Sequence, residues 1–207
     1  MGSVWTIVVA AGAGHRYGGA KQYERLGDRR VIDWSLATAA AATDGVVAVV
    51  AEAAPVEVVA DHTVTGGLTR SASVRAGLAA VPEAADVIVV HDAARPLASP
   101  GLFAAVIEAV RDGADAALPA VPVTDTIRHR DGNPVDRDEL LAVQTPQAFA
   151  AGRLRAVHAQ KPEATDDASL VEAAGGTVVV VAGESRNAKI TSPDDLVVAA
   201  ALLGAPA

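Results

Sequence analysis

Three cations in this chain have residue types and surroundings suited to phosphate chemistry: Arg16, Lys21 and Lys189. Arginine presents a planar fork to phosphate oxygens, whereas lysine is a compact point charge that can follow a developing negative charge. Lysine is scarce here, because Lys21, Lys161 and Lys189 stand against fourteen arginines. Each lysine alone is equally typical of a solvated surface cation. Two of the three lie in motif-like loops, however, and this placement favours triphosphate chemistry.

The loop of residues 10–21 follows an apolar run and contains four glycines. Without a Cβ, glycine lets backbone N–H groups approach an anion closely, so the loop predicts a phosphate-binding turn. Gly14 and Gly19 have the interval of a Walker A loop, but no Lys-Ser or Lys-Thr pair follows them. A dinucleotide-binding loop would need a glycine at the position of Tyr17. The segment therefore predicts a phosphate-binding loop of neither type that carries two cations.

Asp92 ends another apolar run, within the segment His91-Asp92-Ala93-Ala94-Arg95-Pro96. A carboxylate that faces a phosphate site makes chemical sense chiefly as a ligand of Mg²⁺, because this cation prefers oxygen and offsets the repulsion between carboxylate and phosphate. Taken alone, an aspartate three residues before an arginine is more typical of a local ion pair or a turn. The metal-ligand hypothesis for Asp92 thus depends on the other loops.

Two further segments carry groups that could contact a nucleotide. Residues 66–73 contain two glycines with accessible backbone groups, and Ser73 lies near the start of a predicted helix. Such a set could recognise the edge of a base, whereas helix capping is the alternative and is the role expected for Ser71. Residues 187–191 bring Lys189 near the end of a strand, and the Ser-Pro pair that follows predicts the start of another helix.

The elements that must position these loops follow from the apolar pattern. Five continuous apolar runs predict buried strands at residues 4–9, 46–50, 87–90, 116–121 and 177–181. Segments with helical spacing lie between them at residues 32–42, 73–81, 102–110 and 154–158. This alternation predicts an α/β fold with a mostly parallel, Rossmann-like sheet flanked by helices. Ligands of such sheets bind beyond the carboxyl ends of the strands, where the candidate loops lie.

Residues 123–143 differ in composition from the rest of the chain. They are rich in charge and contain the turn signal Asp131-Gly132-Asn133-Pro134, with β-type residues on either side. The pattern predicts a hairpin arm that projects from a single domain of residues 1–207, and we expect this arm to mediate dimerisation. A plain surface loop is the alternative.

Composition excludes several other classes. A chain of 207 residues, 51% of them hydrophobic, is long enough for one sizeable domain. A net charge of −8 with 3% aromatic residues argues against a nucleic-acid partner. The absence of cysteine excludes disulfides and thiolate chemistry. Acidic residues interrupt the apolar stretches before they reach the roughly 18 residues of a membrane span. We therefore expect a cytoplasmic protein with no membrane partner.

In their order along the chain, these segments resemble the 2-C-methyl-D-erythritol 4-phosphate cytidylyltransferase family of the non-mevalonate isoprenoid pathway. The strongest signal is the segment 91–96 with Thr145-Pro146-Gln147 downstream, and the resemblance covers nearly the whole chain. The other pieces are Ala10-Ala11-Gly12-x-Gly14-x-Arg16, Lys21-Gln22-Tyr23, Gly66-Gly67-x-x-Arg70, Asp125-Thr126, Val143-Gln144, Thr165-Asp166-Asp167-Ala168-Ser169 and Lys189-Ile190-Thr191.

The resemblance implies a GT-A-like nucleotidyltransferase fold, a homodimer joined through the arm, and magnesium-dependent transfer of CMP from CTP to a polyol phosphate. It implies that the catalytic residues are Arg16, Lys21 and Lys189. It implies nucleotide contacts from Ala10, Ala11, Gly12, Ala13, Gly14, Gly67 and Ser73. Asp92 would serve both the metal and the acceptor. The acceptor would also be held by Arg95, Thr145, Thr165 and Thr191, together with Thr126 and Arg137 of the partner subunit.

Two features depart from the family's pattern. The interval between Arg16 and Lys21 is shorter than usual and no proline precedes the lysine, and Leu68 replaces a residue that is often acidic. Two alternatives stay open on this sequence. Ribitol 5-phosphate cytidylyltransferases share the same loops and the same arrangement of cations. A catalytically silent nucleotide-binding or dimerisation module is the alternative from another class.

Overall fold

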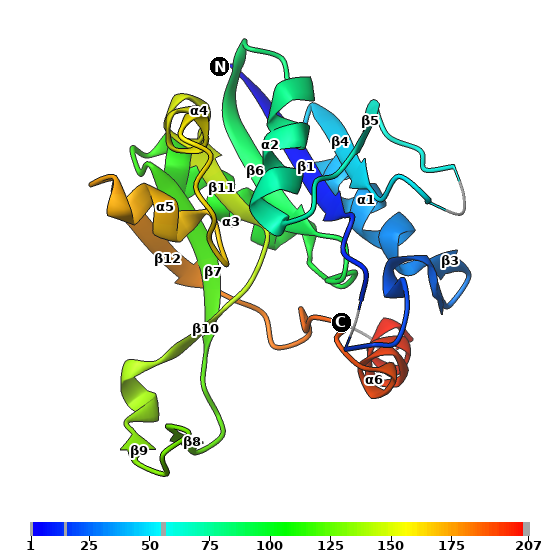
Figure 1. The fold of residues 1–207 in the computed structure, drawn as a ribbon, viewed down its shortest axis with the longest axis vertical. Coiled ribbons are helices and arrows are strands. Elements are labelled where there is room, and N and C mark those ends of the chain that lie inside the picture. Colours follow the sequence, from blue (N-terminus) through cyan, green and yellow to red (C-terminus); the bar gives the residue numbers. More distant parts are fainter. Residues whose placement is uncertain (1, 15, 55–56, 205–207) are drawn as a thin grey trace.

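A twisted sheet of eight strands forms the centre of the protein (Figure 1). The structure, a computed structural model, describes residues 2–14, 16–54 and 57–204. The spatial order of strands is β10-β7-β11-β6-β1-β4-β5, and β12 also pairs with β7. The strands are β1 (Ser3–Ala10), β4 (Gly45–Val50), β5 (His62–Thr65), β6 (Ala85–Asp92), β7 (Ala116–Pro122), β10 (Leu141–Val143), β11 (Gln147–Ala150) and β12 (Val178–Ala182).

The strands that carry the predicted loops are parallel neighbours. β1 pairs with β4 on one side and β6 on the other, and in this register Val9 lies opposite both Val49 and Asp92. Every residue of β4 is buried, because helices cover both faces of this part of the sheet. The loops after β1 and β6 consequently leave the sheet side by side, at the same edge.

The other half of the sheet contains antiparallel strands that the apolar pattern does not predict. β11 runs antiparallel to both β6 and β7. At Ala120, β7 pairs with β10 and β12, and at Ala117 it pairs with β11 and β12. β10 and β11 therefore lie one after the other along the same side of β7, and residues 144–146 interrupt them. The predicted α/β fold with a mostly parallel sheet is confirmed.

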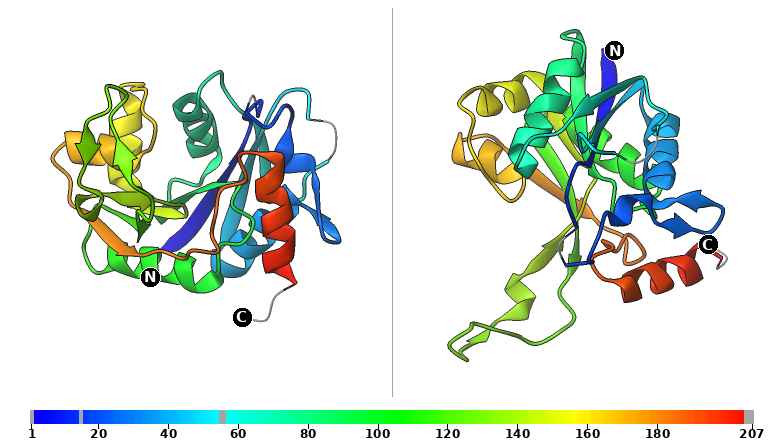
Figure 2. Two further views of the ribbon diagram at one scale, coloured as in Figure 1. Left: turned by 90° about the horizontal axis from the view of Figure 1, so that it is seen from below. Right: turned by 45° about the vertical axis from the view of Figure 1, so that its right-hand side comes forward.

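Helices pack on both faces of the sheet (Figure 2). α1 and α3 contribute buried side chains to the core on one face, and α2, α4 and α5 contribute to the core on the other. α6 belongs to a smaller apolar cluster that contains Leu26, Val31 and Ile190. The helices are α1 (Val31–Ala42), α2 (Arg70–Ala80), α3 (Pro100–Arg111), α4 (Ala151–Ala159), α5 (Ala168–Ala173) and α6 (Pro193–Leu203).

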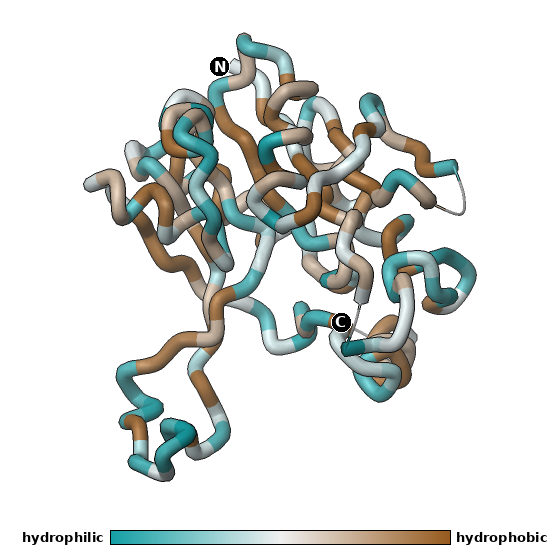
Figure 3. Tube along the Cα trace, viewed as in Figure 1, coloured by the Kyte–Doolittle hydropathy of each residue, from teal (hydrophilic) through white to brown (hydrophobic). Residues whose placement is uncertain are grey.

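The predicted hairpin in residues 123–143 is confirmed and projects away from the sheet (Figure 1). Its strands β8 (Ile127–Arg128) and β9 (Pro134–Val135) pair with each other, and the 3₁₀-helix η2 (Arg137–Glu139) follows them. The tip is hydrophilic, whereas apolar residues mark the strands of the sheet (Figure 3). At the base of the arm, Leu141 and Val143 expose 53% and 40% of their surface.

Two short elements complete the fold beside α1. β2 (Arg25–Leu26) and β3 (Arg29–Arg30) form a small hairpin, and the 3₁₀-helix η1 (Lys21–Tyr23) precedes it. Within the described residues, no helix combines the length and the apolar character needed to cross a bilayer.

Candidate active site

A cavity of about 600 Å³ opens at the carboxyl ends of β1 and β6. It brings together four segments that are far apart in the sequence. They are the first loop (residues 9–14 with Arg16, Lys21 and Gln22), the start of α2 (residues 67–70 with Ser73), the residues after β6 (92–94) and Lys189. The cavity lies where the predicted topology placed the ligand, because the ends of parallel strands meet there.

A buried side chain, that of Gln22, holds the backbone of the first loop by hydrogen bonds. The amide of Gln22, 4% exposed, donates to the carbonyl oxygens of Ala10 at 2.8 Å and Gly12 at 3.2 Å. Gly14 has a φ of +66°, and a Cβ there would lie 1.9 Å from the carbonyl oxygen of Gly19. Gly14 is therefore required by the shape of the turn, in which its carbonyl oxygen accepts from the N–H groups of Tyr17 at 2.9 Å and Gly18 at 3.0 Å.

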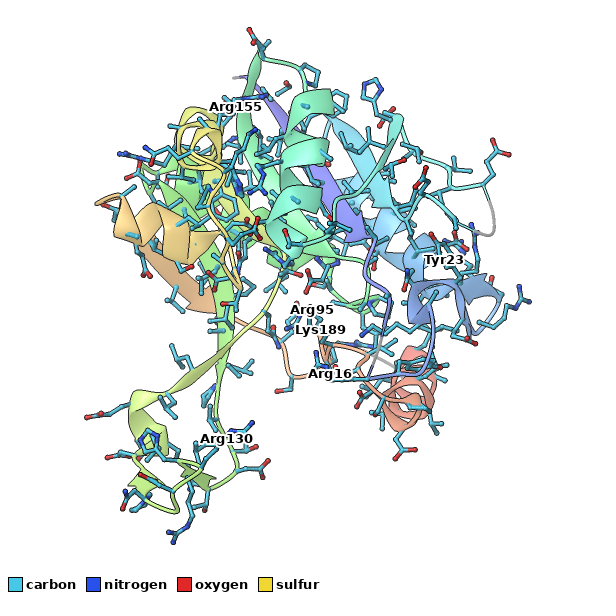
Figure 4. All side chains as sticks on the ribbon, in the orientation of Figure 1. Arg16, Tyr23, Arg95, Arg130, Arg155 and Lys189 are labelled. Carbon is cyan, nitrogen blue, oxygen red and sulfur yellow. The ribbon has the colours of Figure 1, made fainter. Side chains whose placement is uncertain are left out.

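Four cations line this cavity, and the charges of Arg16 and Lys189 act on Lys21. Burial is the main cause that lowers the pKa of Lys21, and repulsion from Lys189 and Arg16 lowers it further. Figure 4 shows Arg16 and Lys189 in the same region, between the sheet and α6. The folded chain thus holds several positive charges together without neutralising all of them, and an anionic ligand would relieve this repulsion.

Asp92 is the acidic side chain among the described residues that line the cavity. Lys189 Nζ lies 2.5 Å from its Oδ2, and Arg70 Nε lies 3.6 Å from its Oδ1. Burial acts to raise the pKa of Asp92, but Lys189 and then Arg70 outweigh it, and the pKa falls to about 2. The carboxylate is therefore ionised at every pH at which the protein would work.

A chain of buried hydrogen bonds supports Asp92 from behind. The Asp92 backbone N–H donates to Thr145 Oγ1 at 3.0 Å, and Thr145 Oγ1 lies 3.1 Å from His91 Nδ1. His91 Nε2 lies 3.2 Å from the carbonyl oxygen of Arg95, which can only accept, so Nε2 carries the proton. Burial lowers the pKa of His91 to about 4. The ring is thus neutral, Nδ1 accepts, and the Thr145 hydroxyl donates to it.

The start of α2 forms the opposite wall. Thr69 caps the helix, because its hydroxyl accepts from the backbone N–H of Ala72 at 3.0 Å. The expectation that Ser71 is the cap is wrong, since its hydroxyl reaches across to the backbone of Ala164. Ser73 lines the cavity, and its hydroxyl donates to the carbonyl of Thr69 at 2.9 Å. Because Thr69 is the cap, α2 begins at Arg70 and not at residue 73, where the spacing predicts its start.

The sequence-predicted site residues divide into two groups. Those that line the cavity are Ala10, Ala11, Gly12, Ala13, Gly14, Arg16, Lys21, Gly67, Ser73, Asp92 and Lys189. The predicted acceptor-binding residues other than Asp92 lie outside that lining. Arg95 is anchored by its Nη1 to the carbonyl of Asn187 at 2.7 Å, and the Thr191 hydroxyl donates to the Lys189 carbonyl at 3.0 Å.

The remaining predicted acceptor residues are either exposed or buried behind the site. Thr126 and Arg137 are exposed on the arm, and Arg137 Nη1 donates to the carbonyl of Thr124 at 2.6 Å. Thr165 is exposed in the segment between α4 and α5. Thr145 is 5% exposed and its hydroxyl is already engaged beneath Asp92. The cavity is thus lined by the residues that the sequence predicts to contact a nucleotide, whereas Asp92 alone of the predicted acceptor-binding residues lines it.

Sequence reasoning gave no role to Gln22, Arg70 or Asp167. Arg70 lines the cavity, and its Nη1 lies 2.6 Å from Oδ2 of the fully buried Asp167. The residues next to a glutamine or an arginine in the sequence form no pattern that predicts a contact with a distant segment. Their presence in the quoted motifs was the only available signal.

The donor set of the cavity sets a limit on metal binding. Across the described ranges, no group of three or more His, Cys, Asp or Glu side chains is placed to hold a metal ion. Magnesium is commonly bound by one or two carboxylates together with substrate phosphates. Asp92 with a bound triphosphate fits that pattern, whereas a metal held by protein ligands alone does not fit.

An α/β sheet whose strand ends carry a glycine-rich loop, clustered cations and one carboxylate is the arrangement expected of the nucleotidyltransferase class. Residues 4–205 match the family IspD, 2-C-methyl-D-erythritol 4-phosphate cytidylyltransferase, and the chain belongs to that family.

Relatives and solved structures agree with this assignment. The chain is 44% identical to the 2-C-methyl-D-erythritol 4-phosphate cytidylyltransferase of Rhodococcus jostii, over 98% of this chain and 96% of that protein. It is also 44% identical to the bifunctional enzyme IspD/IspF of Dinoroseobacter shibae, where the match covers 97% of this chain but 54% of the relative. The chain thus spans about half the length of such bifunctional relatives. The crystal structure of the Thermus thermophilus cytidylyltransferase superposes with a TM-score of 0.85 at 38% identity, covering 98% of each chain.

Proposed function

We propose that this protein transfers CMP from CTP to 2-C-methyl-D-erythritol 4-phosphate, forming 4-diphosphocytidyl-2-C-methyl-D-erythritol and releasing pyrophosphate. The observation that carries the proposal is the convergence of Arg16, Lys21, Lys189 and Asp92 on one cavity beside the glycine-rich loop. Membership of the family supports the choice of nucleotide and acceptor.

The nucleotide side of the proposal uses backbone groups and one hydroxyl. The N–H groups of residues 11–14 would bind the triphosphate, and the cations at positions 16 and 21 would neutralise it. Gly67 lines the cavity and would offer its backbone to cytosine. A side chain does not fit at this position, since a Cβ would lie 2.4 Å from the Cβ of Ala72. Ser73 would add its hydroxyl to the same recognition.

In the proposed reaction, a phosphate oxygen of the acceptor attacks the α-phosphorus of CTP. The new P–O bond joins CMP to the acceptor. The bond from the α-phosphorus to the oxygen that bridges to the β-phosphate breaks, and pyrophosphate leaves with the bonding electrons. Such a transfer requires alignment and charge stabilisation more than a covalent intermediate. Arg16, Lys21 and Lys189 would stabilise the negative charge that develops around phosphorus.

Mg²⁺ is part of the proposal. Asp92 would contribute one ligand and the triphosphate the others, and the ion would supply further charge neutralisation at the phosphates. Lys189 would then exchange its partner, since its ammonium contacts Oδ2 of the same carboxylate. Asp92 would in addition orient the acceptor.

The acceptor side is proposed to be completed by a second copy of the chain. Thr126 and Arg137 are exposed on the projecting arm and do not line the cavity of their own subunit. A homodimer joined through residues 123–143 would bring Thr126 and Arg137 of the partner subunit to Arg95, Thr145, Thr165 and Thr191. Sedimentation tests this step, because a protein that stays monomeric at micromolar concentration has no such route.

A cytoplasmic location completes the proposal, since a chain without cysteine needs no oxidising compartment.

Pyrophosphate release measured with CTP, Mg²⁺ and each of two acceptors tests the function. Turnover with 2-C-methyl-D-erythritol 4-phosphate is expected. Turnover with ribitol 5-phosphate alone would instead establish the alternative acceptor. CTP binding without pyrophosphate release for either acceptor would refute an enzymatic role and favour a silent nucleotide-binding module.

A further inference from the structure

Arg70 lies between two carboxylates that belong to different parts of the fold. Its Nε faces Asp92 Oδ1 at 3.6 Å, and its Nη1 contacts Asp167 Oδ2 at 2.6 Å. The side chain is 23% exposed and lines the cavity, so it forms part of the wall beside Asp92. One guanidinium thus connects the end of β6 to the segment that precedes α5.

Asp167 is fully buried and does not line the cavity. Its Oδ1 lies 2.9 Å from His158 Nε2, and since an ionised carboxylate only accepts, that nitrogen carries the proton. Burial acts to raise the pKa of Asp167, but the hydrogen bond from His158 and the charge of Arg70 outweigh it and lower the pKa. Asp167 is therefore an anion held inside the protein by two donors.

We infer that Arg70 is a positioning residue for the Asp92 carboxylate, and that the buried pair Asp167–His158 holds Arg70 in place. The inference deepens the proposed function and rests on it. The other oxygen of the Asp92 carboxylate contacts Lys189. When Lys189 turns to the phosphates, Arg70 is the cation that still fixes the carboxylate.

The shape of arginine is essential to this role. A planar guanidinium can face two carboxylates at once along separate N–H directions, whereas the ammonium of lysine has no such fork. A buried anion at position 167 fixes one end of the fork, and the geometry then determines where the other end lies. Misplacement of a reacting group by about 1 Å costs on the order of 10²-fold in rate.

The test measures kcat, the KM for CTP and the KM for 2-C-methyl-D-erythritol 4-phosphate in Arg70→Lys, Asp167→Asn and the double variant. Each single change is expected to lower kcat by about 10- to 100-fold and to alter the KM for CTP by less than about threefold. The double variant is expected to be no slower than the slower single variant, because Asp167 acts through Arg70.

The matched control is Glu163→Gln. Arg75 on the same helix holds the same segment, through Glu163 at 2.8 Å and the carbonyl of Pro162 at 2.7 Å, without touching Asp92. Loosening this second tie is expected to leave kcat within about twofold of the native enzyme. Thermal melting of each variant identifies any that fails to fold.

The outcomes are separable. Native kcat in both single variants overturns the inference, and so does a double variant slowed by the product of the single effects. If Asp167→Asn does not fold, Arg70→Lys decides alone, because its part-exposed side chain tolerates the change, and native kcat overturns the inference. Failure of the proposed function would appear differently, as absence of pyrophosphate release in the native enzyme.

Discussion

Lys21 is a site at which activity and stability should respond in opposite directions. Burial and the nearby charges of Lys189 and Arg16 lower the pKa of Lys21, so its positive charge is less favourable in the folded protein than in the unfolded chain. Replacing it with glutamine removes this unfavourable charge and keeps most of the side-chain volume. The free energy of unfolding at neutral pH should therefore stay constant or rise.

The same change should be severe for catalysis. Loss of one preorganised group that stabilises developing charge costs about 10²–10³-fold in kcat, or about 2.7–4 kcal/mol. Pyrophosphate release with saturating CTP and acceptor measures the loss, and thermal melting in parallel measures stability. Lys161→Gln is the control, because this lysine is exposed and lies outside the cavity. Near-native turnover in Lys21→Gln, or a large fall in its melting temperature, would refute the reasoning.

Three further outcomes follow from the site. Gly14→Ala should raise the KM for CTP about tenfold, because the turn has a φ of +66° and no room for a Cβ, and a CTP titration with unchanged KM would contradict this. Burial lowers the pKa of His91 from 6.5 to about 4, so its contribution to stability is complete above pH 6.5 and is lost as the pH falls to about 4. This loss amounts to about 3 kcal/mol. In denaturant titrations at several pH values between 6.5 and 4, the free energy of unfolding should change less with pH in His91→Gln than in the native protein. Thr145→Val should cost about 1–3 kcal/mol of stability by leaving the Asp92 N–H unpaired, while Thr145→Ser should restore the native value in the same titration.

The parts of the fold that the sequence predicts are those built from continuous apolar runs. β1, β4, β6 and β7 lie within two residues of their predicted positions, because strands buried on both faces need apolar side chains throughout. β12 also forms within two residues of its predicted position, but the expectation that it is buried is wrong, since Val179 and Val180 expose 38% and 51% of their surface. β10 and β11 have no such run. Polar residues and Pro146 separate them, and their pairing with β6 and β7 depends on contacts distant in sequence.

The same distinction applies to the site. The meeting of the first loop with Asp92 follows from one topological rule, since adjacent parallel strands end at the same edge. The contact between Arg70 and Asp167 joins residues 97 positions apart, and the sequence contains no periodic signal for it. Thr145 illustrates the other limit, because its motif marks the residue but not the direction of its hydroxyl, which lies beneath Asp92.

The split strand beside β7 links the most exposed part of the molecule to its reaction centre. β10 forms the base of the arm, β11 continues along the same side of β7, and the residues between them carry Thr145, which bonds the backbone of Asp92. A single stretch of chain therefore runs from the base of the arm to the hydroxyl that accepts from the Asp92 backbone N–H. A partner that binds residues 123–143 would thus contact a segment that leads directly into the support of Asp92, outside the cavity itself.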